Sequence, residues 1–433
     1  MSAWSSSAPG RGRTAAAFAR EAWPALAFGF LLAFSSSVGQ SYFIGLFGAQ
    51  IRSDLELSHG QFGAIYAAAT LASAATLLFA GKLADRRAPH VASVITALWL
   101  AGAAGLMAFV SHPAMLLVAL FALRLGGQGM MSHIALTTLA RWFAAERGRA
   151  VALATLGFPA AEAALPPLAA AGLVWLGAGP VWLIAAAVMA LAVGPGSLLL
   201  SRTASSRLAR RASAGGSEAQ AGQHAPSWKR AEVLKDPRFY AIAPSLLAAP
   251  FIVTGLVFHQ ARLVEAKGWT LPEFASLFPL FAAAAVTAGL VVGAAVDRFG
   301  SRRVLALYLI PLALSLLVLS GTASLAGAGA AMALAGLTAG GTTVLFGTIW
   351  AELYGPAHLG AIRALAVSLM VVATALSPAA MGALIDAGVA LEAQFQALAV
   401  YIGFCIAAVL RVQSRLLPGP PPGRAEETNI HES

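Results

Sequence analysis

The sequence has few charged residues and almost no cysteine. Charged side chains make up 11% of the 433 residues, whereas soluble proteins carry about 25%. The hydrophobic fraction is 59% and the mean hydropathy is +0.77. The single cysteine, Cys405, excludes an intramolecular disulfide. This composition predicts an all-α membrane protein, because helices satisfy their own backbone hydrogen bonds in lipid.

The chain also lacks the sequence patterns of enzymes and metal proteins. No P-loop is present, so ATP-driven transport is unsupported. One cysteine and eight scattered histidines provide no metal-ligand spacing. We therefore expect no enzymatic activity and no cofactor.

Long charge-free runs predict the membrane crossings. A crossing needs about 20 residues, and three runs are too long for one helix: 88–123, 163–201 and 304–351. Each contains a break rich in small residues, polar residues or proline. We expect twelve helices: 24–49, 60–80, 90–110, 114–140, 149–175, 180–200, 239–261, 272–295, 303–320, 326–350, 361–385 and 391–411.

The distribution of basic residues predicts the orientation of these helices. With both termini inside, 24 of the 28 lysines and arginines fall in inner segments, three fall in outer loops, and Arg124 lies within a span. Such asymmetry predicts cytoplasmic termini and a location in the cytoplasmic (inner) membrane. The net charge of +10 then needs no nucleic-acid partner.

The expected helices form two six-helix bundles, residues 22–200 and 239–411. Between them, residues 201–238 begin with a segment rich in Ser, Ala, Gly and Arg, which predicts a flexible cytoplasmic linker. Residues 1–21 and 412–433 are expected to be cytoplasmic tails, the second of them disordered.

An internal repeat relates the two bundles at an offset of 212 residues. Two capping boxes, Ser58-x-x-Gln61 and Thr270-x-x-Glu273, predict helix starts at corresponding positions. Each is followed by a Gly-x-x-x-Asp-Arg segment, and the six residues of these two segments match at the same offset: Gly81, Asp85, Arg86, Gly293, Asp297 and Arg298.

GAAVDRFGSRR (293–303) resembles the signature loop of the major facilitator superfamily, and GKLADRRAPH (81–90) keeps its Gly, Asp and Arg. The stretch ARWFAAERGRAVALATLG (140–157) is similar to the monocarboxylate and oxalate–formate branch. The resemblance implies two bundles that rock about a midplane site. It also implies a gating role for Arg302 and for the six repeat residues. Asp85 and Asp297 would pair with arginines and meet helix N-termini of the opposite half. Alternatively, they only fix tight loops.

Two ionisable residues other than histidine lie deep in the expected spans, Arg124 and Glu162. A charge at the bilayer centre costs about 2.5–3.5 kcal/mol on insertion scales, so such groups tend to be functional or paired. Both lie about 10–13 residues from the outer helix ends, so they are expected to meet. The pair either binds an anion and carries a proton, or forms a permanent structural ion pair.

Four further polar residues are candidates for substrate or proton contact: Gln40, Tyr42, His259 and Thr342. Each has a plain structural alternative in helix packing, interfacial wetting or local hydrogen bonding. Asp386 and Glu352 fall at helix ends and are expected to be solvated.

We therefore expect a monomeric secondary active transporter that uses alternating access. The predicted solute is a small organic anion such as a monocarboxylate, with protons as coupling ion. Proton-antiport efflux of hydrophobic compounds is the alternative transport function. A membrane sensor or scaffold that transports nothing is an alternative of a different class. The expected partners are a small-molecule substrate, protons and the lipid bilayer.

Overall fold

The computed structural model describes residues 15–143, 146–212, 228–355 and 358–413. Twelve helical segments in this part of the chain are long and apolar enough to cross a membrane. No strand occurs among the described residues. The all-α prediction and the predicted number of spans are therefore confirmed.

The described residues 15–212 form the N half. Its six spans contain α1 (Ala15–Ser35), η1 (Ser36–Gly39) and α2 (Ser41–Leu46); α4 (His59–Asp85); α5 (Pro89–Met107); α6 (Pro113–Arg124), η2 (Leu125–Met131) and α7 (Ser132–Trp142); α8 (Arg147–Thr155) and α9 (Gly157–Leu176); and α10 (Ala178–Val188), η3 (Met189–Val193) and α11 (Gly194–Ala212). The short helix α3 (Gly48–Asp54) follows the first span.

The described residues 228–413 form the C half. Its six spans contain α13 (Pro237–Phe258); α15 (Leu271–Ala275) and α16 (Phe278–Phe299); α17 (Ser301–Leu305) and α18 (Ile310–Gly321); α19 (Leu325–Tyr354); α20 (Leu359–Asp386); and α21 (Leu391–Val412). Two short helices lie outside the spans, α12 (Arg230–Val233) and α14 (Gln260–Lys267).

Both predicted capping boxes are confirmed at the starts of α4 and α15. The Ser58 hydroxyl accepts a hydrogen bond from the Gln61 amide at 3.1 Å, and the Gln61 side chain accepts one from the Ser58 amide at 2.9 Å. Thr270 and Glu273 make the same reciprocal bonds. These bonds satisfy N–H groups that a helix leaves free in its first turn.

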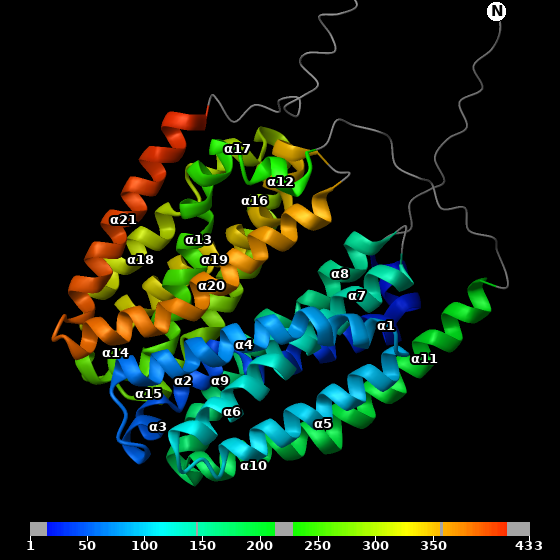
Figure 1. Cartoon of the computed structure of the whole chain (residues 1–433), viewed down its shortest axis with the longest axis horizontal. Helices are drawn as coiled ribbons and strands as arrows, with labels where there is room; N and C mark the ends of the chain where they lie inside the picture. The colour runs from blue at the N-terminus through cyan, green and yellow to red at the C-terminus, as the bar shows by residue number, and fades with distance from the viewer. Residues whose placement is uncertain (1–14, 144–145, 213–227, 356–357, 414–433) are drawn as a thin grey trace, which may run out of the picture.

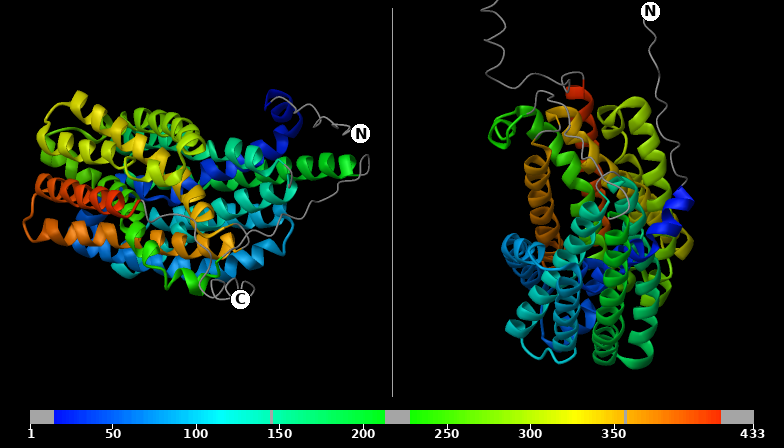
Figure 2. Two further views of the ribbon diagram at one scale, coloured as in Figure 1. Left: turned by 90° about the horizontal axis from the view of Figure 1, so that it is seen from above. Right: turned by 90° about the vertical axis from the view of Figure 1, so that its right-hand side faces the viewer.

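The two halves converge at one end of the molecule and diverge at the other (Figure 1). α1 begins and α21 ends at the diverging end, which we call the terminus face. The opposite end, which carries α3, α14 and the last residue of α20, is the far face. Figure 2 shows the N half below the C half when the molecule is viewed from the right-hand side of Figure 1.

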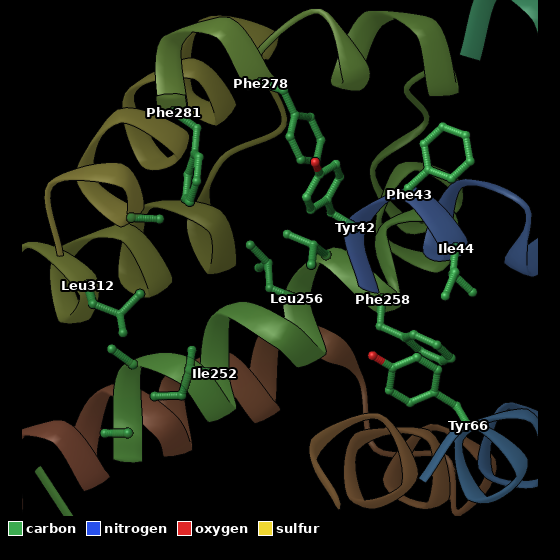
Figure 3. Close-up of a cluster of buried hydrophobic side chains, with 14 of the residues drawn as sticks. Tyr42, Phe43, Ile44, Tyr66, Ile252, Leu256, Phe258, Phe278, Phe281 and Leu312 are labelled. Carbon is green, nitrogen blue, oxygen red and sulfur yellow. The ribbon is translucent and has the colours of Figure 1, made fainter. Parts of the chain in front are cut away.

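The main contacts between the halves are those of α4 with α20, α9 with α16, and α2 with α13, and smaller contacts join α15 with α9 and α14 with α2 and α3. Aromatic side chains from both halves fill this junction near the far face (Figure 3). Phe258 of α13 lies between two rings of α4, with ring centres 4.7 Å from Phe62 and 4.6 Å from Tyr66. The ring centre of Tyr42 lies 6.0 Å from that of Phe278 of α16.

The linker differs from the expectation at both of its ends. Helix α11 continues to Ala212, where the Ser- and Ala-rich composition had predicted flexible chain from residue 201. Alanine and arginine favour helix, so a helix already started in the membrane can continue past it. Beyond residues 213–227, which lie outside the described residues, α13 already begins at Pro237, with Asp236 capping it. Of the predicted tails 1–21 and 412–433, residues 1–14 and 414–433 lie outside the described residues, and α1 already begins at Ala15, inside the predicted N-terminal tail.

Candidate functional site

The first span is interrupted near its middle. Helix α1 ends at Ser35, the 3-10 turn η1 covers Ser36–Gly39, and Gln40 has extended backbone (φ −88°, ψ 153°) before α2 begins. Gly39 packs directly on the end of α6 and on η2, since a Cβ at this position would lie 2.2 Å from the Leu123 carbonyl oxygen and 2.9 Å from the Gly127 Cα. An interrupted helix can present backbone carbonyls to a neighbouring side chain.

Arg124 uses one of these carbonyls. Its Nη1 donates a hydrogen bond to the Gly39 carbonyl at 3.0 Å, and its guanidinium carbon lies 5.1 Å from the centre of the Tyr66 ring. Arg124 is only 2% exposed, and its Nε has no partner. The π-helical segment η2 follows directly, and π-bulges occur frequently at functional sites.

The expected ion pair between Arg124 and Glu162 is absent. Among the described residues, no carboxylate oxygen lies within 4.0 Å of an Arg124 nitrogen. Glu162, half-buried on α9, makes no hydrogen bond or ion pair with any described residue, but it interacts electrostatically with the Tyr42 hydroxyl. The prediction was wrong because similar depth does not fix the direction in which two side chains leave their helices.

Buried hydroxyl groups lie on the elements that surround Arg124. Tyr66 and Thr70 lie one turn apart on α4, and Ser37 lies on η1. The three residues are at most 1% exposed, and none of the three hydroxyl oxygens has a partner among the described residues. Sequence reasoning missed Tyr66 and Thr70, because a tyrosine and a threonine in an apolar helix are ordinary packing residues.

The other predicted contact residues have different surroundings. Gln40 is half-buried at the helix break, and Tyr42 is 7% exposed with an unpartnered hydroxyl. Thr342 donates a hydrogen bond to the Thr338 carbonyl of its own helix at 2.8 Å. Tyr42 lies on α2, which contacts α9, the helix of Glu162, whereas Thr342 lies on α19 in the C half.

His259 lies one residue beyond the span that ends at Phe258. Its Nε2 donates a hydrogen bond to the Pro378 carbonyl at 2.9 Å, and its ring centre lies 5.9 Å from that of His59. Burial lowers the pKa of His259 to about 4. His259 is therefore neutral near pH 7 and contributes to packing at the far face.

Asp85, one of the predicted gating residues of the N half, belongs to an ionic cluster at the terminus face. Asp85, the last residue of α4, pairs with Arg141 of α7 and lies 3.2 Å from His133 Nε2. Arg141 also donates to the Asp85 backbone carbonyl at 3.2 Å. Arg86 is exposed, and a Cβ at Gly81 would lie 3.4 Å from the His133 ring.

In the C half, the acidic residue of the corresponding ion pair is Glu352 and not the loop aspartate. Arg302 Nε lies 2.9 Å from Glu352 Oε1, and the Ser301 amide donates to Glu352 Oε2 at 2.7 Å. Glu352 is thus an ion-pair partner and a helix cap, which corrects the expectation that it is solvated. Asp297 and Arg298 are exposed at the end of α16, and Asp297 pairs with no described residue. A Cβ at Gly293 would have no neighbouring atom within 4 Å among the described residues.

In this conformation, neither loop aspartate bonds to a helix N-terminus of the opposite half among the described residues. The halves diverge at the terminus face, so Asp85 and Asp297 cannot reach across. Such a contact is found at the far face instead, where Asp386 of α20 accepts hydrogen bonds from the first residues of α4. Asp386 is exposed, as expected of a residue at a helix end, but it also bonds to a helix start that the sequence does not identify.

Comparisons with known proteins agree with this architecture. A sequence profile described as Major Facilitator Superfamily matches residues 29–270 and, in a second match, residues 251–432. A protein of Thermoproteus tenax described as an uncharacterized 38 kDa protein in a 23S RNA operon is 29% identical over 348 residues, covering 79% of this chain and 83% of that protein.

Two solved structures have the same fold. A bacterial homologue of the human lysosomal transporter Spinster, in an inward-facing and unoccupied conformation, aligns with a TM-score of 0.63 at 14% identity, covering 94% of this chain and 98% of that one. The nucleoside transporter NupG aligns with a TM-score of 0.66 at 14% identity, covering 92% and 98%. At this identity the likeness concerns the fold alone.

Proposed function

Since this chain belongs to the major facilitator superfamily and is a multi-pass secondary transporter of a small solute, we propose that it moves a small organic anion together with protons across the cytoplasmic membrane. The observation that supports an anion is the buried guanidinium of Arg124. It lacks a carboxylate partner among the described residues. A buried charge is costly unless it is paired, and an anionic solute would supply the missing countercharge.

The neighbouring groups suit such a solute. Arg124 Nε and the hydroxyls of Tyr66, Thr70 and Ser37 are buried without partners, so they could donate hydrogen bonds to carboxylate oxygens. Tyr66 also supplies a ring against the guanidinium. Binding would require an opening between α4 and η2, because Arg124 is 2% exposed here.

Glu162 is the proposed proton carrier. It is an acidic residue within a span, has no ion-pair partner among the described residues, and lies on α9, which contacts α2 beside the helix break. A carboxyl in an apolar site favours its neutral form. Protonation would remove the negative charge near the site and so favour entry of an anion.

The basic residues at the terminus face support cytoplasmic termini. With this orientation, the contacts between the halves lie on the outer side and the divergence faces the cytoplasm, so the conformation is inward-facing. Alternating access would close the terminus face, where Asp85 and Asp297 would approach helix starts of the opposite half, and open the far face.

Proton-antiport efflux of hydrophobic compounds is the second candidate. Aromatic side chains gather between the halves, among them Tyr42, Phe278 and Phe281 (Figure 3), and such a surface would accept an apolar solute. Efflux gives no role to the unpaired guanidinium, so we favour the anion.

Counterflow in proteoliposomes tests the proposal. Vesicles loaded with one small carboxylate should take up the same labelled carboxylate, faster at acidic than at neutral pH. Glu162→Gln should retain counterflow and lose the pH dependence. Counterflow of apolar drugs with none of carboxylates would favour efflux, and absence of counterflow for every solute would favour a sensor or scaffold. Unchanged pH dependence in a folded Glu162→Gln variant would exclude Glu162 as the proton carrier.

A further inference from the structure

Asp386 ends α20 in the C half and caps α4 in the N half. Its Oδ2 accepts hydrogen bonds from the Ser58 hydroxyl at 2.6 Å and from the Gly60 amide at 2.8 Å, and its Oδ1 accepts one from the His59 amide at 3.0 Å. These amides are among those that a helix leaves free at its start. A negative charge at this position also interacts favourably with the helix dipole.

The corresponding helix start in the C half is capped differently. There Thr270 and Glu273 form the capping box, so the carboxylate comes from the same helix. In the N half the matching residue is the neutral Gln61, and the carboxylate comes from the other half of the molecule. The charge at the α4 N-terminus is therefore present only while the two halves touch.

The backbones around Asp386 are in close contact. A Cβ at Gly63 would lie 2.4 Å from the Pro378 carbonyl, and one at Gly382 would lie 2.5 Å from the His59 carbonyl. α4 and α20 meet here without intervening side chains, so separating them removes all three bonds to Asp386. The amides of His59 and Gly60 and the Asp386 carboxylate would then depend on water.

We infer that Asp386 is the lock of the far face: its carboxylate holds α4 and α20 together in the conformation described here and releases α4 when the far face opens. The inference rests on the proposed alternating access but requires no knowledge of the solute. Hydrogen bonds to a charged acceptor and a negative charge at a helix start both stabilise the closed far face. Loss of the lock should shift the closed-to-open ratio about tenfold.

Distance measurements between spin labels test the lock without a transport assay. Labels at Ser53→Cys of α3 and Ala266→Cys of α14, both exposed positions on opposite halves, report the opening of the far face. The full chain in lipid nanodiscs would carry Cys405→Ser in every sample, so that only the two introduced cysteines are labelled. The distances in Asp386→Ala and in Asp386→Asn would each be compared with those in the labelled protein that retains Asp386.

The repeat provides matched controls. Thr270→Ala removes the corresponding hydroxyl from a helix start that receives no carboxylate from the other half, whereas Ser58→Ala removes a donor to Asp386. Gln61→Glu places a second carboxylate at the α4 start, where it should repel Asp386. We expect longer label distances in Asp386→Ala, Asp386→Asn, Ser58→Ala and Gln61→Glu, and unchanged distances in Thr270→Ala.

The inference is overturned if folded Asp386→Asn keeps the parental distance distribution, or if Thr270→Ala lengthens the distances as much as Ser58→Ala does. Should Asp386→Ala fail to fold, Asp386→Asn and Gln61→Glu retain the size of the side chain and still decide the question. If the distances change as expected but the protein transports no carboxylate, the role of Asp386 stands and only the proposed anionic solute is rejected.

Discussion

The two halves share one helix order and one repeat, but they differ in where they hold charge. The N half buries Arg124 in the middle of a span, next to a break in the first span and a π-helical segment. The C-half residue that corresponds to Arg124 at the repeat offset of 212 residues is Gly336. A Cβ at Gly336 would lie 2.3 Å from the Phe281 carbonyl oxygen. One half thus accommodates a guanidinium where the other packs two backbones together.

The terminus-face loops differ in the same way. In the N half the acid, Asp85, lies at the end of α4 and its basic partner Arg141 lies on α7. In the C half the base, Arg302, lies beside the loop and the acid Glu352 lies on α19. A repeated motif therefore keeps its sequence while its ion pairs are rearranged, and motif identity alone does not fix the partners.

The largest effect is expected from Arg124→Gln, which removes the charge that distinguishes the N half. Truncating one partner of a buried charge pair costs about 2–5 kcal/mol, so carboxylate binding should weaken at least about 30-fold. Arg124→Lys, the matched control, keeps the charge but loses the planar fork, and it should bind with intermediate affinity. Carboxylate-induced thermal stabilisation of the purified variants measures both. Equal stabilisation of the parent and Arg124→Gln would assign Arg124 a purely structural role.

The next largest effect is expected from Gly300→Ala in the C-half loop. Gly300 has φ +81° and ψ 151°, a region that glycine alone occupies readily, and strain there costs about 1–3 kcal/mol. A Cβ would also lie 3.3 Å from Glu352 Oε1. The corresponding N-half residue, Ala88, has φ −62°, so Ala88→Gly should destabilise by less than about 1 kcal/mol. Thermal unfolding of the two variants would contradict this account if Ala88→Gly were the less stable.

A smaller effect should separate the two loop aspartates. Asp85→Asn breaks an ion pair with Arg141 that is partly exposed, with side chains 35% and 52% accessible. We expect a loss of stability of about 0.5–1 kcal/mol. Asp297→Asn should leave the stability of this conformation unchanged, because Asp297 pairs with no described residue. Melting temperatures measured at low and high salt provide the check, since screening should reduce only the effect at Asp85.

The smallest effect is expected from Thr342→Val. The Thr342 hydroxyl already bonds to the Thr338 carbonyl of its own helix, so its loss should change carboxylate affinity by less than about twofold. The same measurement of carboxylate-induced thermal stabilisation, applied to Tyr66→Phe in the N half, should show a larger loss of affinity. A larger change for Thr342→Val would mean that the C half contributes directly to the solute site.

Much of the architecture could be predicted from local sequence. The lengths of the apolar runs predicted twelve spans, and the repeated capping boxes predicted two helix starts at the correct residues. Gly300 marks a positive-φ turn that the first loop, with Ala88, does not make. These features depend on residues close together in the chain, where backbone geometry and hydrogen bonding act directly.

The sequence alone therefore determined the membrane class, the number of helices and the presence of a buried arginine. Only the tertiary structure decided the partners: Arg124 contacts Gly39 and Tyr66 rather than Glu162, and the exposed Asp386 bonds to α4. Depth in the membrane follows from chain length, but the direction of a side chain around its helix axis and the identity of the neighbouring helix follow from packing. A polar group in lipid must find a partner, and the folded chain determines which partner is within reach.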